Sequence, residues 1–117
     1  MATMQARMDE KLVTTKNYEA QRAMLAEMRG DKESAARHFL AAGHLELVLA
    51  EDYRQVEKPA LTLRSFLAAA SCFWRAGQPE HARAIFKVLF RKYPKRKKYI
   101  GTVVADLEKS YPTTKSA

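Results

Sequence analysis

The sequence of 117 residues contains few of the residues that form disulfides or zinc sites, which stabilise many small proteins. Its single cysteine, Cys72, cannot form an internal disulfide, and no CxxC or Cys/His pair is spaced to hold zinc. The amino terminus lacks the apolar stretch of a signal peptide, and no apolar run approaches the length that spans a bilayer. We therefore expect a chain without a transmembrane segment, in a reducing compartment such as the cytoplasm.

Catalytic motifs are missing as well. The sequence holds no HExxH, no GxSxG and no glycine-rich phosphate loop. The three histidines, His38, His44 and His81, are not spaced to share one helix face as metal ligands. Cys72 lies within the apolar run FLAAASCFW, where a small buried thiol is commoner than a nucleophile. The sequence therefore predicts a protein that is not an enzyme and uses no cofactor or metal.

Acidic side chains are scarce in only one half of the chain. Residues 1–58 hold nine basic and ten acidic side chains, whereas residues 59–117 hold twelve basic and three acidic ones. The formal net charge of +8 thus belongs to the second half. Such asymmetry suggests attraction to an acidic protein, a nucleic acid or an anionic membrane, and it bears on association rather than on fold.

Helix-forming residues fill the intervals between four glycines and four prolines, and they predict an all-α fold. Asp31 is expected to cap the second helix, and Pro59 and Pro79 suit the first turns of the third and fourth. The expected helices cover residues 17–29 with an extension back toward residue 9, 31–56, 59–77, 79–93 and 95–110. A chain of this length fits one domain, residues 1–117.

An internal repeat becomes visible when the chain is shifted by 47 residues, because GDKESAARHFLAA then falls on GQPEHARAIFKVL. The matched pairs are Gly30 with Gly77, Glu33 with Glu80, Ala35 with Ala82, and Phe39 with Phe86. Glycine permits the left-handed residue that ends a helix, alanine lets two helices approach, and the aromatic ring fills the space between them. The pattern predicts a helical hairpin written twice, over residues 17–56 and 59–94, with residues 95–110 as a capping helix.

The second copy resembles the tetratricopeptide repeat (TPR) family. Its matching residues are Phe66, Ala69, Ala70, Phe73, Gly77, Ala82, Phe86 and Pro94. The first copy keeps only the downstream half of the pattern, since Glu19 and Arg22 stand where apolar residues are expected. The offset of 47 also exceeds the usual repeat of about 34, which predicts an extended second helix and a longer connection around residues 57–59. The resemblance covers roughly residues 17–94 and implies a non-catalytic scaffold that binds a peptide or partner protein.

Two candidate partner-binding stripes follow from the helix faces that the core leaves free. On the third helix the stripe is Arg64, Leu67, Ser71, Trp74 and Arg75, which combines the residue types enriched at binding hot spots. On the first helix, Met24 and Met28 offer adaptable apolar surface. The alternatives are that Trp74 packs under the last helix and that the methionines serve the core or a dimer contact. Fewer than three repeats leave stacking faces open, so a homo-oligomer is also expected.

The segment RKYPKRKKY concentrates positive charge. Its six cations are Arg91, Lys92, Lys95, Arg96, Lys97 and Lys98, and two tyrosines accompany them. Cations could neutralise phosphates while the tyrosines stack on bases, so nucleic-acid binding is the alternative function. We favour a solvated basic turn, because no recognised nucleic-acid-binding motif accompanies the segment. Composition does not separate these uses from binding to an anionic lipid.

Overall fold

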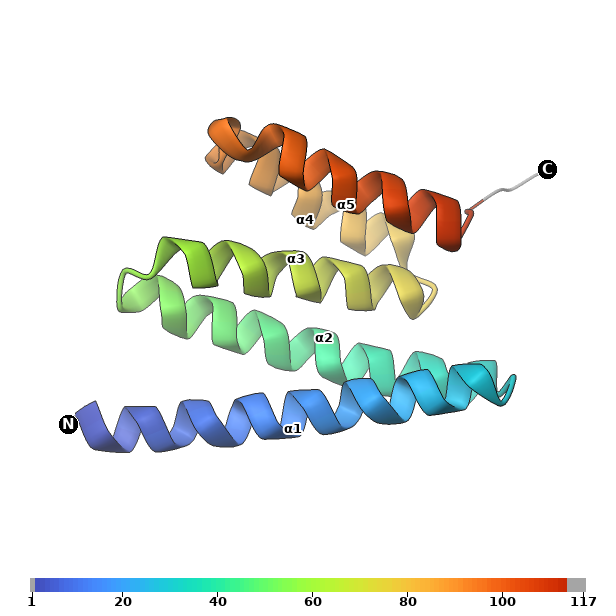
Figure 1. Ribbon diagram of the computed structural model, residues 1–117, viewed down its shortest axis with the longest axis horizontal. Coiled ribbons are helices and arrows are strands. Elements are labelled where there is room, and N and C mark those ends of the chain that lie inside the picture. The colour runs from blue at the N-terminus through green and yellow to red at the C-terminus, as the bar shows by residue number, and fades with distance from the viewer. Residues whose placement is uncertain (1, 114–117) are drawn as a thin grey trace.

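A computed structural model describes the backbone of residues 2–113 and the side chains of residues 9–113. The helices are α1 (Ala2–Met28), α2 (Lys32–Gln55), α3 (Pro59–Arg75), α4 (Pro79–Lys92) and α5 (Lys97–Ser110), with a short 3₁₀ helix η1 (Pro94–Arg96) before the last. Consecutive helices run antiparallel, so the α2–α3 and α4–α5 turns lie at one end and the α1–α2 and α3–α4 turns at the other (Figure 1). The predicted all-α class with antiparallel hairpins is confirmed.

The expected helix starts are confirmed except at the first and last helices. The Asp31 carboxylate accepts a hydrogen bond from the Ser34 backbone N–H at 3.1 Å and so caps α2. Pro59 and Pro79 occupy the first turns of α3 and α4. α1 begins well before residue 17, because the two threonines near its middle do not interrupt the helix. α5 begins at Lys97 rather than residue 95, because the chain first makes the 3₁₀ turn after Tyr93.

The two matched glycines end their helices in the same way. The φ angle is +81° at Gly30 and +86° at Gly77, in the left-handed region that favours glycine. Each glycine N–H donates to the carbonyl three residues earlier at 3.0 Å, and the next residue donates to the carbonyl five residues earlier at 2.9 Å. The matched glycines of the two sequence copies therefore form turns of the same geometry.

The turn between α2 and α3 has a residue other than glycine in the same position. Glu57 has a φ of 57°, and the N–H of Lys58 donates to the Tyr53 carbonyl at 3.0 Å. α2 has 24 residues against 14 in α4, which accounts for the long offset between the copies. The expected longer connection around residues 57–59 is wrong, since residues 56–58 join α2 to α3 as briefly as residues 76–78 join α3 to α4.

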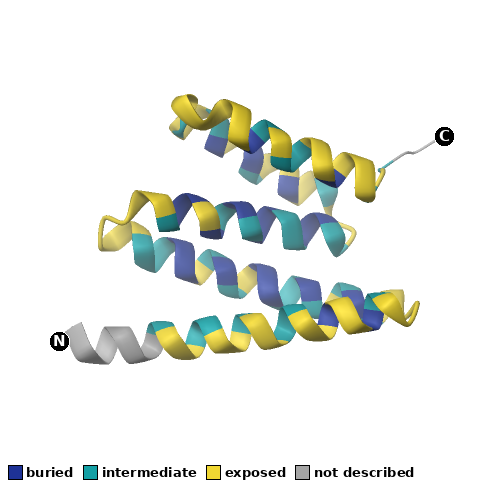
Figure 2. Ribbon diagram, viewed as in Figure 1, coloured by how far each residue is buried: buried dark blue, intermediate teal, exposed yellow. Residues whose placement is uncertain are grey.

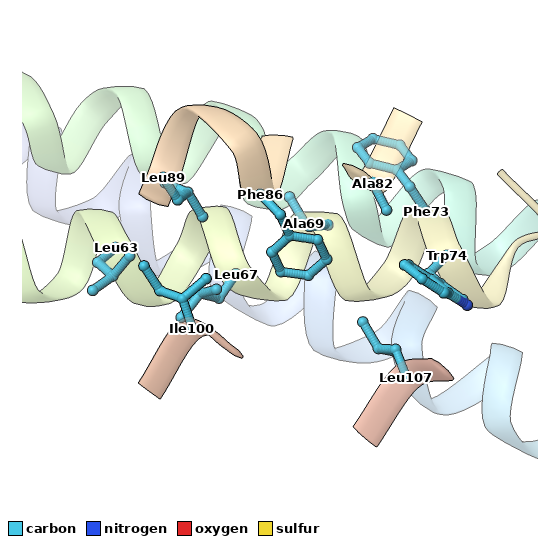
Figure 3. Packing of buried hydrophobic residues seen from close by; sticks show 11 residues of the cluster. Leu63, Leu67, Ala69, Phe73, Trp74, Ala82, Phe86, Leu89, Ile100 and Leu107 are labelled. Atoms are coloured by element: carbon cyan, nitrogen blue, oxygen red, sulfur yellow. The ribbon is translucent and has the colours of Figure 1, made fainter. Parts of the chain in front are cut away.

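The main core surrounds α3, which is buried along most of its length (Figure 2). Figure 3 shows side chains of α4 and α5 converging on α3, among them Ala82, Phe86, Leu89, Ile100 and Leu107. Phe73 and Ala82 are fully buried, as the repeat pattern predicts, whereas Phe66 is only half-buried against this cluster. A smaller core holds the first hairpin and consists of Ala23, Ala26, Ala35 and Phe39.

Polar pairs supplement this smaller core where the repeat pattern fails. Glu19 stands where an apolar residue was expected, and its carboxylate lies 2.6 Å from Nδ1 of His38 on α2. One turn earlier on α1, Nζ of Lys16 lies 3.2 Å from the carboxylate of Glu46, which is only 6% exposed. A charge pair of this kind fixes the register of two helices more than it stabilises them. The first hairpin therefore keeps its geometry with little apolar burial from α1.

Candidate interaction surfaces

The predicted stripe on α3 does not form one accessible surface. Leu67 and Trp74 are 4% and 2% exposed and belong to the main core, which corrects the expectation that they contact a partner. Nε1 of Trp74 donates a hydrogen bond to the Tyr111 carbonyl at 2.9 Å, so the indole packs under the end of α5. Arg64 is exposed, and Ser71 is half-buried with its hydroxyl bonded to the Leu67 carbonyl.

Arg75, the last member of that stripe, joins the two hairpins instead. Its guanidinium donates to the Tyr111 hydroxyl at 2.8 Å and to the Glu27 carboxylate at 3.1 Å. It also lies 4.3 Å above the ring of Phe39. The Tyr111 hydroxyl donates to the same Glu27 oxygen at 3.2 Å, and burial raises the pKa of Tyr111 above its usual value. These contacts connect α1, α2, α3 and the end of α5, and no local sequence pattern predicted them.

The two methionines of the first helix are accessible. Met24 is 41% exposed and Met28 is 82% exposed. Tyr18 and Leu25 on the same helix are also more than half exposed. This face of α1 therefore offers scattered apolar side chains, and its use as a partner-binding surface stays a prediction.

A groove that the sequence reading missed runs along α3 and α4. It has a volume of about 340 Å³ and is lined mainly by apolar side chains, among them Phe66, Ala84, Ile85, Val88, Leu89 and Tyr93. Val88 is 44% exposed because it lines this groove. Phe66 is only half-buried for the same reason. The sequence feature that indicates the groove is the apolar pair Ala84 and Val88. These residues stand one turn apart, beside the core positions of α4.

Cations stand at the groove where it meets the α2–α3 turn. Arg54 from the end of α2 lines it and forms an ion pair with Glu51, which lowers the Glu51 pKa. Lys92 from the end of α4 also lines it, lies near enough to lower the Glu51 pKa further, and makes no ion pair with any described residue. The groove is thus apolar along its length and positive at this end.

The cations of the basic segment RKYPKRKKY all lie on the surface of the molecule. All six of its cations are exposed, and none forms an ion pair in the part of the chain that the structure describes. They are distributed over the end of α4, η1 and the first turn of α5. The Arg96 guanidinium lies 4.8 Å above the ring of Tyr99, which is 43% exposed. Tyr93 is half-buried against the main core.

The remaining reactive groups have structural partners. Burial raises the pKa of the Cys72 thiol to about 11, so the thiol stays protonated near neutral pH. The rings of His44 and His81 pack on Phe73, with centroid distances of 5.0 and 4.1 Å. Within residues 9–113, no three His, Cys, Asp or Glu side chains gather as metal ligands would. The helices described here include none with the length and apolar character needed to cross a membrane.

No protein-family model matches the chain, and no curated protein or solved structure matches it significantly. The resemblance to tetratricopeptide repeats thus stays a prediction from the residue pattern.

Proposed function

We propose that the chain is a non-catalytic protein interaction module, similar to a short tetratricopeptide repeat domain, that binds a segment of a partner protein in the groove along α3 and α4. The observation that carries this proposal is the apolar lining of that groove. Exposed apolar grooves on soluble proteins commonly mark sites where another protein docks. The lone cysteine fits a partner met in the cytoplasm.

The groove favours an amphipathic, acidic partner segment. Ile85 and Val88 would receive its apolar anchors, because both lie on the side of α4 that faces the groove. Lys92 lies one turn beyond Val88 and has no ion pair among described residues, so it would receive a carboxylate near the end of the segment. The strongly basic second half of the chain would steer an acidic partner toward this face.

The test begins with a peptide-display selection on the wild-type chain, followed by fluorescence anisotropy of the enriched peptides. The variant Val88→Glu places a charge in the groove without disturbing the core, because Val88 is 44% exposed. The matched control is Val48→Glu, since Val48 is 47% exposed on α2 and does not line the groove. We expect peptides with apolar anchors and acidic residues, bound at least about 10-fold more weakly by Val88→Glu and equally by Val48→Glu.

Two outcomes would contradict this assignment. Equal peptide affinity in wild type and Val88→Glu would remove the groove from the binding site. A homo-oligomer of the wild-type chain that Val88→Glu dissociates, measured by sedimentation, would make a second copy the occupant rather than a separate partner. A homo-oligomer unaffected by that substitution would leave the groove free and would direct attention to the exposed face of α1, where Met28 lies.

A further inference from the structure

We propose that the turn between α4 and α5 is a binding site for single-stranded nucleic acid, which adjoins the groove at Lys92 and Tyr93 but does not depend on the partner protein proposed above. Residues 91–99 form this site, which we call the basic turn. Its ligand chemistry is a phosphate backbone with unpaired bases. Three observations support it: the absence of neutralising partners, the position of the cations on the helices, and the exposed pairing of an arginine with a tyrosine.

Four of the six cations of the basic turn are not placed to stabilise the fold. Arg91 and Lys92 lie in the last turn of α4, where positive charge suits the helix dipole. Lys97 and Lys98 lie in the first turn of α5, which contains no acidic residue and has no side-chain cap, so the dipole opposes their charge. With Lys95 and Arg96 added, this arrangement costs stability through like-charge repulsion. A bound polyanion would remove that cost.

Several basic side chains elsewhere in the molecule form ion pairs. Lys16, Arg54, Arg75 and Arg83 each form one, whereas none of the six cations of the basic turn does so among the described residues. Six free cations so close together match a chain of phosphates better than they match a single carboxylate. Counterions held there are released when a polyanion binds, so binding must weaken steeply with salt.

Tyr99 favours unpaired bases over a lipid surface. Its ring is 43% exposed beside the Arg96 guanidinium, and both groups stack on bases in single strands. Membrane binding would call for aliphatic side chains that insert between lipids. Residues 91–99 contain no aliphatic side chain other than Pro94, and the neighbouring Leu89 and Ile100 are buried, so the basic turn offers no such anchor.

The experiment is fluorescence anisotropy of labelled single-stranded and duplex oligonucleotides at near-physiological and doubled salt. If all six cations contact phosphates, doubling the salt should weaken single-strand binding by roughly 15- to 20-fold. Replacing four of them by serine should weaken binding roughly 100-fold or more at near-physiological salt, and should leave only about a 3-fold effect of doubling it. This variant changes Lys95, Arg96, Lys97 and Lys98.

The first hairpin supplies matched controls at the opposite end of the molecule (Figure 1). Four exposed cations there can be replaced by serine for the same loss of net charge: Arg22, Arg29, Lys32 and Arg37. Tyr18 carries the Arg22 guanidinium 4.8 Å above its ring, which reproduces the geometry of Tyr99 and Arg96. Tyr99→Ala should weaken single-strand binding by about 5-fold or more, whereas Tyr18→Ala should leave it unchanged. Circular dichroism melts establish that each variant is folded.

The proposal is overturned by any of four results. The first is no binding of the oligonucleotide by the wild type below roughly 100 µM, an affinity typical of non-specific binding. The second is a loss of affinity in the control variant with four serines in the first hairpin as large as the loss in the variant of the basic turn. The third is equal binding of duplex and single strand with no effect of Tyr99→Ala. The fourth is binding of phosphatidylserine vesicles alone, which would make the basic turn a membrane contact.

Discussion

Gly43 of α2 lies against the ring of Phe73 of α3, and its replacement by alanine tests this helix contact. A Cβ atom at Gly43 would lie 3.0 to 3.2 Å from three carbon atoms of the Phe73 ring. That ring is fully buried, and it is held between the rings of His44 and His81. It therefore has little room to move away, so the added methyl group overpacks the core.

The size of the effect follows from two opposing terms. Alanine in a helix interior is favoured over glycine by about 1 kcal/mol. Overpacking a core with one carbon atom costs about 1–3 kcal/mol. Since Phe73 is confined on both sides, we expect the second term to prevail and Gly43→Ala to lower the free energy of unfolding by about 1 kcal/mol.

Gly101 in α5 is the matched control, because it gains the helix propensity without the contact. A Cβ atom built there meets no described atom within 4 Å. Gly101→Ala should therefore raise the free energy of unfolding by about 1 kcal/mol. Urea denaturation followed by circular dichroism measures both changes, and the two variants should differ by about 2 kcal/mol. If Gly43→Ala stabilised the chain as much as Gly101→Ala, the close contact between α2 and α3 would be wrong.

Four further measurements test the α2–α3 turn, the link between the hairpins and the half-buried thiol of Cys72. Glu57→Gly should raise the free energy of unfolding in urea by about 1 kcal/mol, because Glu57 is held at a positive φ; a loss would contradict that turn. Tyr111→Phe should lower it by about 1 kcal/mol by removing the hydrogen bonds to Arg75 and Glu27. The raised pKa of Tyr111 favours the neutral phenol in the fold, so wild-type stability should fall as the pH rises above about 10, more steeply than in Tyr111→Phe. Iodoacetamide should alkylate Cys72 at pH 8 roughly 100-fold more slowly in the folded chain than in urea, and equal rates would contradict its pKa of about 11.

Local rules were enough to predict the helices and their order. Gly30 and Gly77 end helices because the left-handed turn favours glycine, and glycine can be recognised in the sequence itself. Asp31, Pro59 and Pro79 mark helix starts for equally local reasons. Glu57 shows where such rules end, because the same turn forms there at a residue that sequence rules do not associate with it.

The orientation of the α3 side chains depended on contacts that the sequence alone does not reveal. Leu67 and Trp74 were expected on a partner-binding stripe, but α5 covers them, and the angle at which α5 crosses α3 is not encoded locally. Arg75 is engaged by Glu27 and Tyr111, which are 48 and 36 positions away in the chain. The groove was not predicted because it is the surface that α2, α3 and α4 leave uncovered where they meet, and it depends on how these helices pack.

Both proposed binding surfaces lie on the half of the molecule that has the larger core, and this placement favours binding. The groove lies along α3 and α4, and the basic turn joins α4 to α5. Inward side chains of α4 and α5, such as Phe86 and Ile100, pack against α3. A surface on such a support is already ordered before a ligand arrives, so less conformational entropy is lost on binding. By contrast, among the side chains that the structure describes, α1 contributes only Ala23 and Ala26 to the smaller core and depends on polar pairs for its register. The rigid support and the excess positive charge therefore occupy the same half of the chain, which is where we expect its partners to bind.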